Sequence, residues 1–138
     1  MADGDVTVTN QLTKDLIDAW FTGTFKMALV NTTFNKDTHN HWSDISASEI
    51  AASGYTAGGA TVANLATSRN DVNDRTEIDF DPVQWTNLAT ATISHAILYK
   101  DTGTPSTSTV VMAIEAPNSN GNNYQISPPA SGGLHLLS

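Results

Sequence analysis

The sequence predicts a mainly β fold: an antiparallel β-sandwich or partly open barrel with one N-terminal helix and a second, short helix. Three observations favour this fold class. Only 14% of the residues are charged, and Thr, Ser and Asn fill the positions that Lys and Glu usually take on helix surfaces. Most apolar runs have the length of strands, and strong helical periodicity occurs once, near the N-terminus.

The helical pattern covers residues 9–22, where charged residues separate the apolar ones. Thr9 or Asn10 can cap the first turn, and Gly23 follows where a left-handed C-cap would lie. Because the apolar stripe of a helix usually covers a core, we expect this helix to pack on the sheet. The stripe consists of Leu12, Leu16, Ile17, Trp20 and Phe21.

Short apolar or alternating segments, separated by turn residues, predict strands. They lie at residues 25–30, 61–68, 75–80, 90–99, 109–115 and 124–127. A polar loop at 31–44 and a short helix at about 43–52 are expected between the first two. Since no long helices lie between the strands, their pairing should be antiparallel. The expected core contains Leu16, Ile17, Met27, Leu29, Ile78, Phe80, Ile97 and Leu98.

A chain of 138 residues has the size of one compact domain, so we expect a single domain over residues 1–138. The two terminal segments, at about 1–9 and 116–138, are rich in polar residues, Pro and Gly. Such segments seldom pack alone, and we expect them to be flexible or extended.

Charge and cysteine usage narrow the function classes. The net charge of −8, from 14 acidic and 6 basic residues, would repel a phosphate backbone, so nucleic acid is not an expected partner. The absence of cysteine excludes disulfides and thiol catalysis. Neither a signal peptide nor a membrane span is recognisable, and we expect a soluble protein with no membrane partner.

His39 and His41, which flank Asn40 close to Asp37 and Asp44, are candidate metal ligands. Imidazole and carboxylate groups are metal ligands, but polar loops also collect them without binding any ion. The sequence offers no second histidine pair nearby. We therefore expect no metal at this loop.

An acidic group could in principle bind Ca²⁺, but it lacks the spacing of a calcium-binding loop. Its alternation with Ile78 and Phe80 is typical of a half-solvated strand. We expect no metal and no cofactor here. The group consists of Asp71, Asp74, Glu77, Asp79 and Asp81.

Catalytic motifs are also lacking in the sequence. No Gly-x-Ser-x-Gly elbow occurs, and Gly58 and Gly59 are not followed by the Lys and Ser/Thr of a phosphate loop. Two carboxylates suffice for glycoside hydrolysis, so a small hydrolase stays an alternative. We expect a protein that is not an enzyme and has no catalytic residue.

The aromatic residues allow two interpretations, because they can fill a core or form a sugar-stacking surface. We expect most of them in the core. Trp42 lies in the polar loop and is therefore a candidate interface residue. The others are Trp20, Trp85, Tyr55, Tyr99 and Tyr124.

Four segments together resemble a family of small virion structural proteins of tailed phages. They are FKMALV at residues 25–30, GYTAGGA at 54–60, DFDPVQW at 79–85 and AILYKDTG at 96–103. Their order along the chain is also similar, over roughly residues 12–115. The resemblance implies a non-enzymatic particle protein and carries no catalytic residue.

The C-terminal part departs from the pattern of this family, in which the chain tends to close with an apolar strand. Here SPPASGG at residues 127–133 precedes the final apolar residues, and proline cannot donate to a strand ladder. Leu134, Leu136 and Leu137 are candidate interface residues of an extended arm on a neighbouring subunit. An ordinary closing strand of the same domain is the equal alternative.

The resemblance leads us to expect a capsid decoration, or cement, protein on the outer surface of a phage head, assembled in the host cytoplasm. Its partner would be the major capsid protein, and acidic charge suits an outer face better than a DNA-filled interior. By analogy with three-fold joints of icosahedral shells, we expect a homotrimer. The alternatives are a head-tail connector, tail or fibre component and, in another class, a carbohydrate-binding module.

Overall fold

The computed structural model describes residue 4, residues 6–128 and the backbone of residues 134–137. The fold is mainly β with antiparallel sheets, one N-terminal helix and a short second helix, as predicted. Two compact units are present: unit 1 comprises residues 1–22, 64–81 and 128–138, and unit 2 comprises residues 23–63 and 82–127. The sequence predicts a single domain over residues 1–138. The division into two units does not test this, so the single domain remains a prediction.

Unit 2 is built on a four-stranded antiparallel sheet with the order β2-β1-β6-β7. Its centre is the pairing of β1 with β6, which runs without interruption from Thr24 opposite Asp101 to Val30 opposite His95. Both central strands are rich in buried apolar residues, as expected for strands covered on two faces. The four strands are β1 (Thr24–Val30), β2 (Ala60–Thr61), β6 (His95–Asp101) and β7 (Val110–Glu115).

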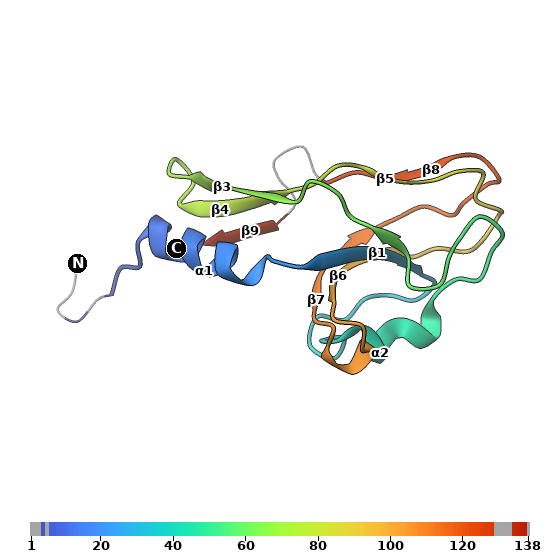
Figure 1. Ribbon diagram of the computed structural model, residues 1–138, viewed down its shortest axis with the longest axis horizontal. Helices are drawn as coiled ribbons and strands as arrows, with labels where there is room; N and C mark the ends of the chain where they lie inside the picture. Colours follow the sequence, from blue (N-terminus) through green and yellow to red (C-terminus); the bar gives the residue numbers. More distant parts are fainter. Residues whose placement is uncertain (1–3, 5, 129–133, 138) are drawn as a thin grey trace. The chain divides into compact units, whose positions relative to one another are not determined.

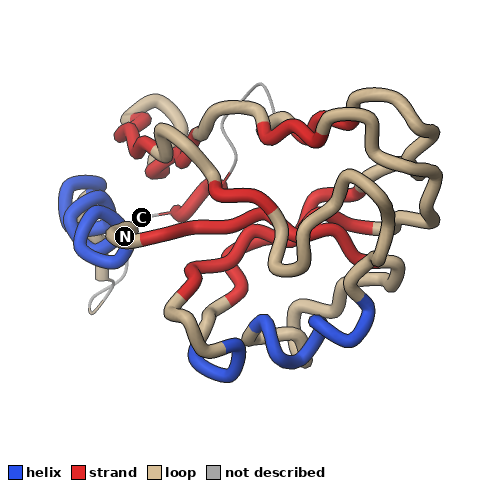
Figure 2. Tube along the Cα trace, turned by 45° about the vertical axis from the view of Figure 1, so that its right-hand side comes forward, coloured by secondary structure: helices blue, strands red, loops and turns tan. Residues whose placement is uncertain are grey.

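Two layers cover this sheet (Figures 1 and 2). On one side, α2 (Trp42–Ile45) packs its Trp42 and Ile45 into a cluster with alternate residues of β1 and β6. On the opposite side lies the two-stranded ribbon of β5 (Val83–Trp85) and β8 (Tyr124–Ile126). Because the sheet ends at β2 and β7 in the described residues, unit 2 is closer to a sandwich than to a closed barrel.

Unit 1 packs α1 (Asn10–Trp20) on a three-stranded antiparallel sheet with the order β3-β4-β9. The strands are β3 (Ala66–Asn70), β4 (Arg75–Asp79) and β9 (Leu134–Leu137). Thr9 caps the helix, since its hydroxyl accepts a hydrogen bond from the Leu12 amide at 3.1 Å. In the described part of the chain, no helix is both long and apolar enough to span a membrane.

The predicted helix at 9–22 and most of the predicted core are confirmed. All eight expected core residues are buried except Leu16, whose side chain is 63% exposed. The prediction for Leu16 is therefore wrong. The helical spacing placed Leu16 on an apolar stripe correctly, but the helix packs on the sheet with a different side, described below.

Several predicted boundaries require correction. The strand expected at 61–68 is split into β2 and β3, because the chain turns through Asn64, which has a φ of 53°. The strand expected at 90–99 begins only at His95. The second helix is shorter than expected, and a 3₁₀ turn, η1 (Ser46–Ser48), continues it. Another 3₁₀ turn, η2 (Pro105–Thr107), precedes β7.

The C-terminal segment contains two strands, β8 and β9, within the range expected to be flexible or extended. The backbone of β9 pairs with β4 of the same chain, from Arg75 opposite Leu137 to Ile78 opposite Leu134. This pairing is the closing strand that the sequence left as an alternative to an arm. The expectations for residues 1–3, 5 and 129–133, and for the side chains of Leu134, Leu136 and Leu137, lie outside the described residues.

Candidate functional site

A polar pocket of about 280 Å³ opens on unit 2 where β1, β6, α2 and two turns meet. Its walls combine a lysine, an aspartate, two aromatic rings and the glycines of the turns. The lining residues are Lys26, Trp42, Gly58, Tyr99, Asp101, Gly103, Pro105 and Ser108.

The aromatic wall is a stacked pair, Trp42 on Tyr99, with parallel rings whose centroids are 4.8 Å apart. The backbone places Trp42 there, because its amide donates to the Ser108 carbonyl at 2.8 Å. The Asp44 carboxylate also fixes the start of α2 by accepting from the amides of Asn40 and His41. Trp42, which the sequence suggests as an interface residue, is only 6% exposed. Little of its side-chain surface is therefore available to a partner.

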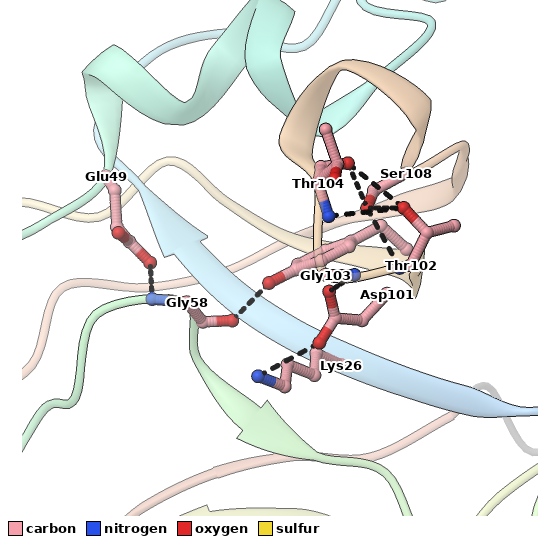
Figure 3. Close-up of polar contacts among 9 residues, drawn as sticks. Lys26, Glu49, Gly58, Asp101, Thr102, Gly103, Thr104 and Ser108 are labelled. Atoms are coloured by element: carbon pink, nitrogen blue, oxygen red, sulfur yellow. Dashed lines mark hydrogen bonds and ion pairs between the residues drawn. The ribbon is translucent and has the colours of Figure 1, made fainter.

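The charged groups of the pocket form one pair, Lys26 and Asp101, with 3.1 Å between Nζ and Oδ2 (Figure 3). The other oxygen of Asp101 accepts the Gly103 amide at 2.9 Å. These two interactions, the Gly103 hydrogen bond first, lower the pKa of Asp101. The carboxylate is therefore held as an ion by its own turn and by β1.

Glu49 connects the glycine-rich turn to the sheet. Its Oε2 accepts from the Tyr55 hydroxyl at 2.5 Å and from the Gly58 amide at 2.8 Å. The Tyr55 hydroxyl in turn accepts the Leu29 amide at 3.1 Å, so one carboxylate links the turn to β1. Burial, and then the hydrogen bond to Glu49, raise the pKa of Tyr55.

The Tyr99 hydroxyl completes this network by donating to the Gly58 carbonyl at 2.6 Å. Burial, followed by the charges of Asp101 and Glu49, raises the pKa of Tyr99. The proton consequently stays on the oxygen and holds the turn against β6. The sequence did not predict a role for Glu49, although its position shortly before a Tyr- and Gly-containing turn is a usable signal.

The hydroxyl groups beside the pocket are also engaged within the chain (Figure 3). The buried Ser108 hydroxyl donates to the Thr104 carbonyl at 2.9 Å and accepts from the Thr102 amide at 3.1 Å. Neither contact is with a general base that could activate a nucleophile. These hydrogen bonds instead stabilise the turn that follows β6. Together with the contacts of Glu49, Tyr99 and Asp101, they hold the turns around the pocket against the central strands β1 and β6.

The histidine loop brings its two imidazoles to different partners. His39 Nδ1 accepts from the Asn35 amide at 2.9 Å, whereas His41 Nδ1 lies 4.0 Å from Asp44. Among the side chains of residues 4 and 6–128, no group of three or more His, Asp or Glu is arranged to hold a metal ion. The expected absence of a metal stays a prediction.

The acidic group of unit 1 is dispersed among separate partners. Glu77 pairs with Arg75 at 2.8 Å, and Asp71 pairs with Arg69 at 2.9 Å. A hydrogen bond from Asn10, and then the Arg69 charge, lower the pKa of Asp71. Asp81 accepts from Asn64 at 2.6 Å. These carboxylates serve local contacts within unit 1.

The candidate sugar-stacking aromatics are mostly buried. Trp85 packs near Tyr55 and Tyr124, with ring centroids 6.2 and 6.1 Å apart, respectively. Together with the stacked Trp42 and Tyr99, they do not present an open aromatic platform. Trp20, on α1, is 37% exposed and belongs to an apolar face of that helix.

In comparisons with protein-family models, with curated proteins and with solved structures, no match to this chain was found.

Proposed function

We propose that the protein is a non-enzymatic structural subunit of a tailed-phage virion, and specifically a capsid decoration protein on the outside of the head. The resemblance of four segments to small virion proteins motivates the proposal. It would act as a homotrimer on the major capsid protein, in particles assembled in the host cytoplasm. A head-tail connector, tail or fibre component is the alternative within the same class.

One observation carries the proposal: three of the resembling segments form one connected scaffold in unit 2. Residues 25–30 and 96–103 contain the paired strands β1 and β6. The turn at 54–60 is fastened to both, by the Tyr55 contact with Leu29 and the Tyr99 contact with Gly58. The resemblance therefore concerns residues that build a fold, which favours a structural role over a catalytic one.

The chemistry of the pocket supports the same proposal. Its ion pair, its tyrosine hydroxyl and its buried serine hydroxyl are bonded within the chain. Such a network stabilises a compact subunit, which is what a particle protein requires. The charge of −8 also favours an outer position, because packaged DNA would repel it.

The test is to measure the copy number and position of the protein in purified particles, by quantitative mass spectrometry and electron cryomicroscopy. One copy per major capsid subunit on the outer surface is the expected result. A few copies per particle at the neck or tail would favour the alternative. Particles that lack the protein would reject a virion role altogether.

Binding to undecorated capsids provides an independent measurement. We expect the purified protein to bind them and to raise the temperature at which the capsids disrupt. Capsids that already carry the protein are the matched control and should take up no more. Equal uptake by both kinds of capsid would indicate non-specific adsorption.

A further inference from the structure

Helix α1 lies against β3 and β4 and faces them with its polar side (Figure 1). Side-chain hydrogen bonds join it to the β3–β4 hairpin: from Asn10 to Asp71 at 3.1 Å, from Arg69 to Gln11 at 2.8 Å and from Thr67 to Asp18. These bonds lie at the exposed surface, where water can replace either partner. Breaking them therefore costs little free energy.

The register of the sheet shows which residues α1 covers. Arg69 lies opposite Thr76, and Thr67 lies opposite Ile78. Residues directly opposite each other in an antiparallel pair have their side chains on the same face of the sheet. Since Arg69 and Thr67 bond to α1, the helix covers the face that contains Thr76 and Ile78, and both of these side chains are fully buried.

The Thr76 hydroxyl is left unpaired beneath this helix. Its oxygen is buried and has no hydrogen-bond partner within the described part of the chain. A buried polar group without a partner is destabilising, because it has lost the water that would otherwise hydrate it. The closed position of α1 thus carries a cost that is removed when the helix moves away.

Ile17 makes the opposing, apolar contribution. It is the buried residue of α1, and the other residues of the helix are partly or fully exposed. The burial of one isoleucine and the cost of one unpaired hydroxyl are similar in magnitude and opposite in sign. The net free energy that holds α1 closed is consequently small beside that of the central strands β1 and β6, most of whose residues are buried.

The C-terminal end of α1 is the natural hinge. There Phe21 is half-buried, and its ring packs edge-on against Trp20 with centroids 4.9 Å apart. The chain then turns through Gly23, which has a φ of 89°. Contacts at this end stay in place if the helix opens from its N-terminal end, where Asn10 and Gln11 bond to the hairpin.

We propose that α1 is a lid over the β3–β4–β9 sheet, which opens from its N-terminal end while the strands beneath it stay paired. Opening hydrates the Thr76 hydroxyl and uncovers the face of β4 that carries Thr76 and Ile78. The lid is a conformational device of unit 1 and does not depend on the virion function proposed above.

Native-state hydrogen exchange of the full chain tests the proposal. An isolated helix of 11 residues is marginal in water, so the amides of residues 14–20 exchange when the lid opens. We expect their protection factors to be at least about 10-fold lower than those of the paired amides of β3 and β4. Equal protection would overturn the proposal, because helix and hairpin would then open as one unit.

Asn10→Ala tests the contact between the lid and the hairpin. The change removes the bond to Asp71, and alanine is the better helix former. Exchange of the α1 amides should nevertheless become about 2- to 10-fold faster. Asp15→Ala is the matched control, because Asp15 accepts from Gln11 within the helix at 2.7 Å. An acceleration as large in the control would show that the hairpin contact does not hold the lid.

Thr76→Val tests the unpaired hydroxyl, since valine keeps the shape of the side chain and removes the polar atom. Exchange of the α1 amides should become about 5- to 100-fold slower, while that of β1 and β6 stays unchanged. If the α1 amides exchange as fast as before, or faster, the hydroxyl does not destabilise the closed lid and the proposal fails.

Thiol labelling gives a second measurement that does not require Thr76→Val to fold. The chain contains no cysteine, so Thr76→Cys places a single thiol beneath α1. Val30→Cys is the control, because Val30 is fully buried in β1 of unit 2. A thiol reagent should label position 76 at least about 10-fold faster than position 30, and adding Asn10→Ala should accelerate only the first. Equal labelling of the two positions would contradict a lid that opens on its own.

Discussion

Gly59 lies directly against the backbone of Met27. A Cβ atom at position 59 would be 2.0 Å from the Met27 carbonyl oxygen, a separation that real atoms do not adopt. Gly59 also has a φ of 85°, in the region that favours glycine. The residue immediately precedes β2, whose Ala60 pairs with Met27. Glycine is therefore required here for the turn to reach the sheet.

Gly59→Ala should consequently lower the free energy of unfolding by about 2 to 5 kcal/mol, from backbone strain and from displacement of β1. Chemical denaturation measures this loss. Gly103→Ala is the control: Gly103 has a φ of 86°, but no atom lies within 4 Å of its Cβ position. It should lose only the backbone contribution, about 1 to 2 kcal/mol. Equal losses would contradict the close approach of Gly59 to β1.

Leu29 is fully buried in β1, and its replacement tests the core of unit 2. Leu29→Ala should cost about 2 to 5 kcal/mol, because it removes apolar contacts and leaves a cavity. Leu29→Met nearly conserves the volume and should cost less than about 1.5 kcal/mol. Thermal and urea unfolding of the two variants measure the difference. A Leu29→Ala variant as stable as the unmodified chain would show that the side chain is not buried.

Three tyrosines, the buried Tyr99 and Tyr124 and the half-buried Tyr55, make the protein sensitive to alkaline pH. Burial raises the pKa of Tyr124 to about 12, and the pKa values of Tyr55 and Tyr99 are also raised. The pKa of an unfolded tyrosine is about 10. Above that pH the unfolded chain releases protons that the folded chain retains, so stability decreases as pH rises. The stabilisation is complete below about pH 10 and, for Tyr124, is lost as pH rises through about 12.

Urea unfolding at a series of pH values above neutrality measures this dependence. Tyr124→Phe should reduce the alkaline slope, because one shifted group no longer titrates. It also removes the hydrogen bond from the Tyr124 hydroxyl to the Pro117 carbonyl, of 2.7 Å, so its stability near neutral pH should fall by about 1 kcal/mol. An unchanged slope in this variant would exclude Tyr124 as a source of the effect.

The side of α1 that faces the sheet could not be predicted from the sequence. Periodicity identified the apolar stripe, but Leu16 lies on the solvent side while Ile17 is buried. The reason is long-range. Gln11 and Asp18 accept hydrogen bonds from Arg69 and Thr67, respectively, which lie far along the chain, beyond β1 and β2. Local spacing carries no information about such partners, whereas it was sufficient to identify the helix itself.

In the candidate site, too, local features could be predicted from the sequence and long-range contacts could not. The buried central strands were predictable, because their apolar runs are continuous. The role of Glu49 could not be predicted, because it depends on the turn that brings the Tyr55 hydroxyl and the Gly58 amide to its carboxylate. Trp42 was placed in a polar loop, but its ring is buried because Tyr99 of β6 stacks on it. Polar neighbours in the sequence thus did not determine its environment.

Chelation tests the prediction that no metal is required. EDTA should leave the melting temperature unchanged, because His39 is hydrogen-bonded to the Asn35 amide and the side chains of residues 4 and 6–128 contain no group of three possible metal ligands. A loss of stability that Zn²⁺ or Ca²⁺ reverses would contradict the prediction. The double variant His39→Ala, His41→Ala would then show whether this loop is responsible.

Removal of residues 134–138 distinguishes a closing strand from an intersubunit arm. The backbone of β9 pairs with β4 between Arg75 and Ile78, and Thr76 and Ile78 of β4 are fully buried. Without β9, one side of β4 loses its hydrogen-bonding partner, so we expect a loss of about 2 kcal/mol or more.

Hydrogen exchange locates this loss within the chain. The amides of β3 and β4 should exchange faster in the truncated protein, while those of β1 and β6 in unit 2 keep their protection. His135→Ala is the matched control, because it alters a side chain and preserves the β9 backbone. An arm that lay on a neighbouring subunit would give the opposite pattern: the truncated chain would be as stable as the full chain when dilute, and only its association would be lost.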